Sequence, residues 1–129
     1  MLAWAAAQLC KLFIELLAHH RLDWHRLTGD GGMPSGHAAT VVALATAALL
    51  RYGATSGAFA VSTVLAIIVM HDAMGVRWQA GQHARTINEL LERNDAPPEA
   101  LLEELLGHTP LQVAAGALLG AATAVLYAT

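Results

Sequence analysis

The nine residues GGMPSGHAA, from Gly31 to Ala39, predict a glycine-rich loop that leads directly into an apolar helix. Ser35 is a favourable N-cap, because its hydroxyl can accept a hydrogen bond from an amide one turn into the helix. The first amides of a helix have no partner within it and lie at the positive end of its dipole, so the junction suits an anion such as phosphate. His37 falls in the first turn, where it can exchange a proton with a bound group. An ordinary capped helix with a surface histidine explains the same residues equally well.

The composition indicates a membrane protein. Of the 129 residues, 56% are hydrophobic and only 13% are charged, and the charges are absent over long stretches. A chain of this length predicts a single membrane domain, residues 1–129. The net charge of −3 and the lack of a basic aromatic patch argue against a nucleic-acid partner. The only cysteine, Cys10, excludes an internal disulfide.

Four apolar segments predict an all-α polytopic bundle with about four transmembrane helices. Some are shorter than the roughly 20 residues of a full span, and alanine dominates the second, which favours close packing in lipid. Four crossings would place the start of the second helix, the end of the third and the start of the fourth on one side of the membrane. The segments are residues 1–18, 35–50, 58–70 (continuing through 73) and 110–128.

The start of the last apolar segment is well marked. Thr109 as N-cap, Pro110 in the first helical position and Gln112 two residues later match a capping box. Gly116 and Gly120, four residues apart, form a small-residue face of the kind that packs helices together in membranes.

A polar insert, residues 71–109, separates the last two apolar segments. Gln82 to Arg93 has the apolar spacing of an amphipathic helix. A second short amphipathic helix is expected after Pro97 and Pro98, with Gly107 as the residue that terminates it.

Charged residues also occur within and after the first apolar segment. Lys11 lies inside the first apolar run and not before it, which favours a retained membrane helix over a cleaved signal. Such a lysine is expected to face protein or a polar cavity, although simple pairing with Glu15 is the alternative. The loop of residues 19–34 holds three histidines without cysteine or clear ligand spacing, so no metal is predicted there. Its Arg21 and Arg26 are better suited to phosphate.

Two motifs carry a family resemblance. PSGH (Pro34 to His37) and HTPLQVAAGALLG (His108 to Gly120) resemble signature motifs of the phosphatidic acid phosphatase type 2 superfamily, which includes the vanadium haloperoxidases. GGMPSGHAA followed by HDAMGVRWQAGQHARTIN resembles more closely the divergent branch of small bacterial and plant membrane proteins. The likeness covers most of the chain from Gln8 onwards.

This resemblance implies an enzyme. In active members the PSGH histidine is the general acid and the later histidine is a nucleophile that forms a phosphohistidine. Carried over by position, His37 is the acid, His108 the nucleophile, and Ser35 and Gly36 contact phosphate. The expected activity is hydrolysis of a lipid phosphate or pyrophosphate without a cofactor, in a bacterial inner membrane. The expected partners are this substrate and membrane lipids, with a homo-oligomer left open.

The chain departs from the superfamily pattern at three places. An arginine expected seven residues after Lys11 is Ala18, the Ser-Arg pair expected before His108 falls on two leucines, and the orienting aspartate is replaced by Gln112. A membrane protein that keeps the anion pocket without turnover is therefore the alternative, since transition-state charge needs positioned cations. Arg77 and Arg26 (or Arg21) are the expected replacements for the lost arginines, and Asp72 (or Glu15) for the lost carboxylate. Lys11 is also expected to bind phosphate, and Gln112 to orient the nucleophile.

Overall fold

The computed structural model describes residues 1–19, 32–94, 97, 100–102, 104 and 106–128, which form helices and connecting segments without any strand. The expected all-α membrane bundle is confirmed. Its helices are α1 (Leu2–His19), α3 (Gly36–Tyr52), α4 (Gly57–Met74), α5 (Val76–Arg93) and α6 (Pro110–Ala128).

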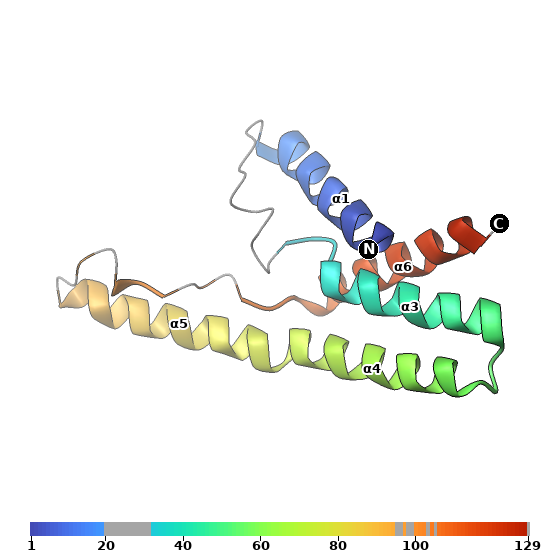
Figure 1. Cartoon of the computed structure of the whole chain (residues 1–129). Helices are drawn as coiled ribbons and strands as arrows, with labels where there is room; N and C mark the ends of the chain where they lie inside the picture. Colours follow the sequence, from blue (N-terminus) through green and yellow to red (C-terminus); the bar gives the residue numbers. More distant parts are fainter. Residues whose placement is uncertain (20–31, 95–96, 98–99, 103, 105, 129) are drawn as a thin grey trace.

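Helix α3 lies at the centre of the bundle (Figure 1). It packs most extensively against α6 and next against α4. Backbone hydrogen bonds join the starts of α3 and α6 to the end of α4: Ser35 donates to the Gln112 carbonyl at 3.0 Å, and His108 to the Ala73 carbonyl at 2.9 Å. The predicted meeting of these three helix ends is therefore confirmed. We call the end of the bundle that contains the start of α3, the end of α4 and the start of α6 the motif end.

The core is built from small residues, and the large apolar residues face outward. Ala7, Ala38 and Ala39 are fully buried, whereas Ile68 is 60% and Leu118 74% exposed. A water-soluble domain shows the reverse, but lipid accepts such a surface. Two continuous helical stretches, Gly57–Arg93 and Pro110–Ala128, are long and apolar enough to cross a membrane.

Two glycines allow α3 and α6 to approach backbone to backbone. A β-carbon on Gly116 would overlap the carbonyl oxygen of Ser35, and one on Gly120 would overlap that of Ala39. The predicted small-residue face of the last helix is thus confirmed as the α3–α6 contact. Because it contains Ser35, this contact also fixes the start of α3.

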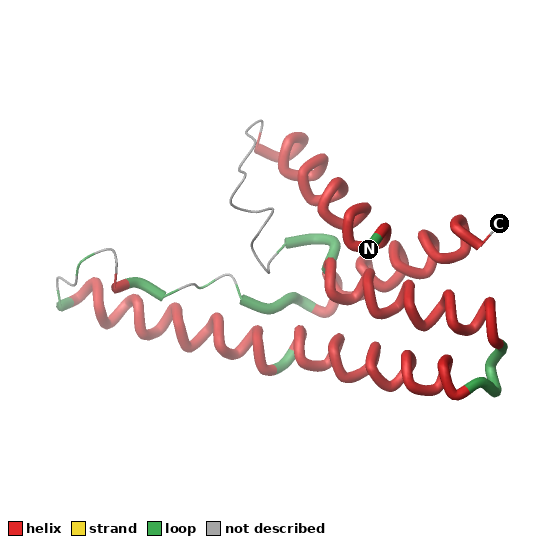
Figure 2. The backbone as a smooth tube through the Cα atoms, viewed as in Figure 1, coloured by secondary structure: helices red, strands yellow, loops and turns green. Residues whose placement is uncertain are grey.

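The polar insert differs from its prediction in its first half. Helix α5 begins at Val76, not at Gln82, and only Gly75 separates it from α4 (Figure 2). The amide of Gly75 still bonds to His71 and its carbonyl accepts from Gln79, so hydrogen bonding continues through the junction. At 1.5 Å per residue, the 18 residues of α5 extend the α4 rod by roughly 27 Å.

The second half of the insert also corrects the prediction, because the described residues between 101 and 107 are not helical. This segment runs back along α5, where Asn88 donates to the Leu102 carbonyl at 2.9 Å and accepts from the Leu102 amide at 2.7 Å. Gly107 does not end a helix. Its φ of +82° and its close approach to the backbone of Trp78 require glycine there. Tertiary pairing with α5 therefore overrides the local preference for a helix.

Candidate functional site at the motif end

The backbone places His108 at the motif end between two helices. Its amide bonds to the Ala73 carbonyl at the end of α4, and α6 begins two residues later at Pro110. The glycine before it packs against the start of α5. His108 is 2% exposed, so its imidazole lies inside the bundle and not on its surface.

The other histidine is held by the N-cap of α3. The Ser35 hydroxyl accepts from the Ala38 amide at 3.3 Å, as expected for an N-cap. His37 therefore occupies the first turn of α3, and it is partly exposed. The Ser35–Gln112 backbone bond ties this turn directly to the first turn of α6.

The two histidines come together although they are 71 positions apart in sequence. Their ring centroids lie 6.3 Å apart and the ring planes are tilted by 56°. Hydrogen bonds of ordinary length could reach one phosphoryl group from both rings. A buried imidazole beside a partly exposed one gives the pair an inner and an outer member.

Ser35 and Gly36 each have a structural reason for their identity. Ser35 is fully buried under α6 and its hydroxyl caps α3. A β-carbon on Gly36 would lie 3.3 Å from Cδ1 of Trp4, so the indole of α1 covers this glycine. Their contacts to phosphate stay predictions.

Helix α1 brings Lys11 to the motif loop. A β-carbon on Gly32 would lie 3.9 Å from Cδ and 4.0 Å from Cε of Lys11, so the lysine stem lies against the loop. Trp4, for which the sequence motifs indicate no role, belongs to the same side of α1. The spacing of Trp4, Gln8 and Lys11, four residues and then three, is the signal that could have identified it.

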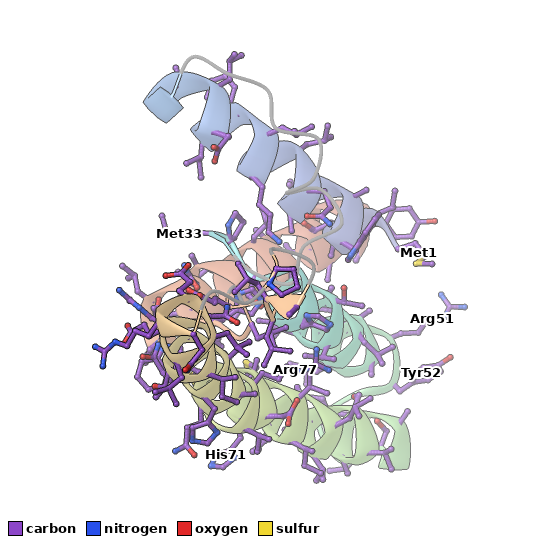
Figure 3. All side chains as sticks on the ribbon, turned by 90° about the vertical axis from the view of Figure 1, so that its left-hand side faces the viewer. Met1, Met33, Arg51, Tyr52, His71 and Arg77 are labelled. Carbon is purple, nitrogen blue, oxygen red and sulfur yellow. The ribbon has the colours of Figure 1, made fainter. Side chains whose placement is uncertain are left out.

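The other residues expected to bind phosphate or to orient the nucleophile form an ion pair or cap a helix. The Arg77 Nε donates to Asp72 Oδ2 at 2.8 Å in a half-exposed ion pair, and Arg77 lies near the middle of the view along the bundle (Figure 3). Gln112 closes the predicted capping box: its Oε1 accepts from the Thr109 amide at 2.9 Å, and its own amide donates to the Thr109 hydroxyl at 3.4 Å. Capping is therefore sufficient to explain Gln112, and its expected role in orienting His108 stays a prediction.

Part of the prediction lies outside the described residues. This applies to Arg21 and Arg26, and to the histidines at positions 20 and 25. Within the described part of the chain, no three His, Cys, Asp or Glu side chains form a group that could hold a metal ion.

Comparison with known proteins agrees with the arrangement of these motifs. The model of the divergent PAP2 family matches residues 1–123, which include both histidine motifs. The chain belongs to the divergent PAP2 family. This confirms the resemblance read from PSGH and the later histidine motif.

A relative of this divergent PAP2 protein is the uncharacterized membrane protein YuiD of Bacillus subtilis. The two are 43% identical over 128 residues, which is 88% of this chain and 81% of the relative. No solved structure matches the chain. Family membership and the apolar helices together identify a PAP2-related membrane protein.

Proposed function

We propose that this protein is a membrane phosphohydrolase that acts on a lipid phosphate or pyrophosphate through a phosphohistidine intermediate. The observation that carries the proposal is the pairing of His37 and His108, from two distant motifs, with ring centroids 6.3 Å apart. A transfer of this kind needs a nucleophile and a proton donor that reach the same phosphorus centre.

In the proposed reaction a nitrogen of His108 attacks phosphorus while the bond from phosphorus to the leaving oxygen breaks. His37 gives its proton to that oxygen, and the alcohol or phosphate leaves. His37 then takes a proton from water, whose oxygen attacks the phosphohistidine and breaks the phosphorus–nitrogen bond. Inorganic phosphate is released and both imidazoles return to their starting states.

Phosphate release from the detergent-solubilised protein tests this function. The panel comprises phosphatidic acid, a polyprenyl pyrophosphate and a soluble phosphate monoester. We expect release from at least one of the two lipids at a rate well above that of a heat-inactivated sample. A wild-type protein that releases no phosphate from any of the three would contradict the proposed activity.

A non-catalytic anion-binding protein is the second candidate. Two observations favour it: Gln112, at the position of the expected carboxylate, caps α6, and Arg77 is paired with Asp72. If the protein is such an anion-binding protein, vanadate or phosphate binds at the motif end without turnover. Binding measured by isothermal titration calorimetry, alongside the release assay, separates the two candidates.

For phosphate binding, Lys11 is the cation that we expect to matter most. Its stem already lies against the motif loop, and a lysine facing lipid at that depth would cost about 2.5–3.5 kcal/mol. Lys11→Met should weaken vanadate binding roughly 10- to 100-fold, the effect of losing a hydrogen bond to a charged group. Lys11→Arg is the matched control and should retain most of the binding. If Lys11→Met binds vanadate as the wild type does, the lysine serves only to pair with Glu15.

The motif end is proposed to face the cytoplasm of a bacterial inner membrane. Arg77, Arg85 and Arg93 lie on this side and Arg51 on the other, and basic residues close to the membrane favour the inside. A membrane-impermeant maleimide should therefore label Thr55→Cys, but not Arg85→Cys, in intact cells that carry a Cys10→Ser background. Lysed cells should label both. Labelling of Arg85→Cys in intact cells would reverse the orientation.

A further inference from the structure

A groove opens at the end of the bundle opposite the histidines. It encloses about 1070 Å³ between the start of α1, α3 from Thr40 to its end, and the end of α6. Seven of its fourteen lining residues are alanine or threonine, among them Ala43, Ala47 and Ala124, and their short side chains leave its volume open. Its size matches sites that hold small organic ligands.

The groove has one charged side chain, and it lies at the mouth. Arg51 ends α3, and the exposed Tyr52 and Tyr127 are also part of the lining. Figure 3 shows Met1, Arg51 and Tyr52 on the same side of the bundle. From His37 to Arg51, α3 rises roughly 21 Å, which places Arg51 near the far membrane interface. Tyrosine and arginine at that depth are typical of residues that meet lipid headgroups.

Among the described residues, no acidic side chain forms an ion pair with this arginine. None of the ten acidic residues of the chain lies between residues 31 and 71 or after residue 104. The acidic residues that the structure describes belong to α1 beyond Lys11, to the end of α4, to α5 and to the segment that runs along α5. A second copy inserted in the same orientation would carry its carboxylates on the same side as the first. It therefore could not neutralise Arg51, whereas a phosphate on a lipid of that leaflet could.

We propose that this groove binds an acyl chain of an anionic phospholipid, whose phosphate is held by Arg51. The apolar walls of α3 and α6 receive the chain, and Tyr52 and Tyr127 flank the headgroup. This lipid occupies the leaflet opposite the histidines and stabilises the contact of α1 with α3 and α6. The site is independent of the proposed reaction.

Native mass spectrometry of the detergent-solubilised protein tests the proposal. The protein is mixed with phosphatidylglycerol and phosphatidylcholine of identical acyl chains in equal amounts. We expect one retained lipid per protein, with several-fold more phosphatidylglycerol than phosphatidylcholine, because the choline ammonium of phosphatidylcholine offsets the phosphate charge that attracts Arg51. Arg51→Gln should abolish this preference, and Arg51→Lys should keep much of it.

A second pair of variants tests the groove itself. Ala47→Phe fills the space between α3 and α6 and should remove the retained lipid, whereas Leu118→Phe, on an exposed position of α6 outside the groove, should not. Equal retention of both lipids by the wild type, or an unchanged preference in Arg51→Gln, would overturn the proposal. So would a lipid-free dimer that Ala47→Phe dissociates, because a second copy would then fill the groove. The Arg51 variants decide the question even if Ala47→Phe does not fold.

Discussion

His108→Ala is expected to reduce phosphate release to the level of the buffer blank. In the proposed reaction this imidazole forms the bond to phosphorus, and its ring centroid lies 6.3 Å from that of His37, the proton donor. Because His108 is buried, the substitution also leaves a cavity. His108→Gln keeps most of the volume and should be equally inactive. Circular dichroism of both variants distinguishes lost chemistry from lost folding.

The other histidine should give a different kinetic signature. His37→Ala should slow release of an alkyl leaving group by about 10²- to 10⁴-fold, the usual contribution of a general acid. With a good leaving group, which needs no proton, an acid-labile phosphoenzyme should accumulate instead. His83→Ala, an exposed histidine on α5, is the matched control and should leave the rate unchanged. Wild-type phosphate release by His108→Ala would show that the assigned nucleophile is wrong.

The largest expected loss of stability comes from a single methyl group at Gly120. A β-carbon there would overlap the carbonyl oxygen of Ala39, which is backbone and has no rotamer to change. Gly120→Ala should therefore force α3 and α6 apart and lower the free energy of unfolding by about 1–3 kcal/mol or more. Unfolding in mixed micelles, followed by circular dichroism, measures this change.

Gly57→Ala provides the matched control, because a β-carbon at Gly57 meets nothing within 4 Å. Alanine has the higher helix propensity, so this variant should be at least as stable as the wild type. Gly116→Ala should lower both the stability and the proposed activity. The added β-carbon would press on the carbonyl of Ser35, and Ser35 caps the helix turn that holds His37. If Gly120→Ala and Gly57→Ala unfold alike, the close α3–α6 contact is not what stabilises the bundle.

The elements with strong local signals were predictable residue by residue. Ser35 caps α3, Thr109 and Gln112 form the capping box before α6, and Gly116 and Gly120 face another helix. Each of these signals depends on residues within a few positions of one another. The meeting of the two histidines also followed from the sequence, because four apolar crossings leave the starts of α3 and α6 on one side.

The polar insert and the surroundings of the histidines were decided by tertiary structure. Leucines at positions 101, 102, 105 and 106 favour a helix locally, yet Asn88 binds the backbone of Leu102 in an extended segment. The pairing of Asp72 with Arg77 depends on side-chain geometry that no pattern specifies, as does the covering of Gly36 by Trp4. The sequence by itself therefore determined the helices, their caps and the shared end of the two histidines, because periodicity and capping act within one or two turns. Tertiary structure alone decided the path of the polar insert along α5 and the contacts of α1 with the start of α3, because these contacts join residues far apart in the chain.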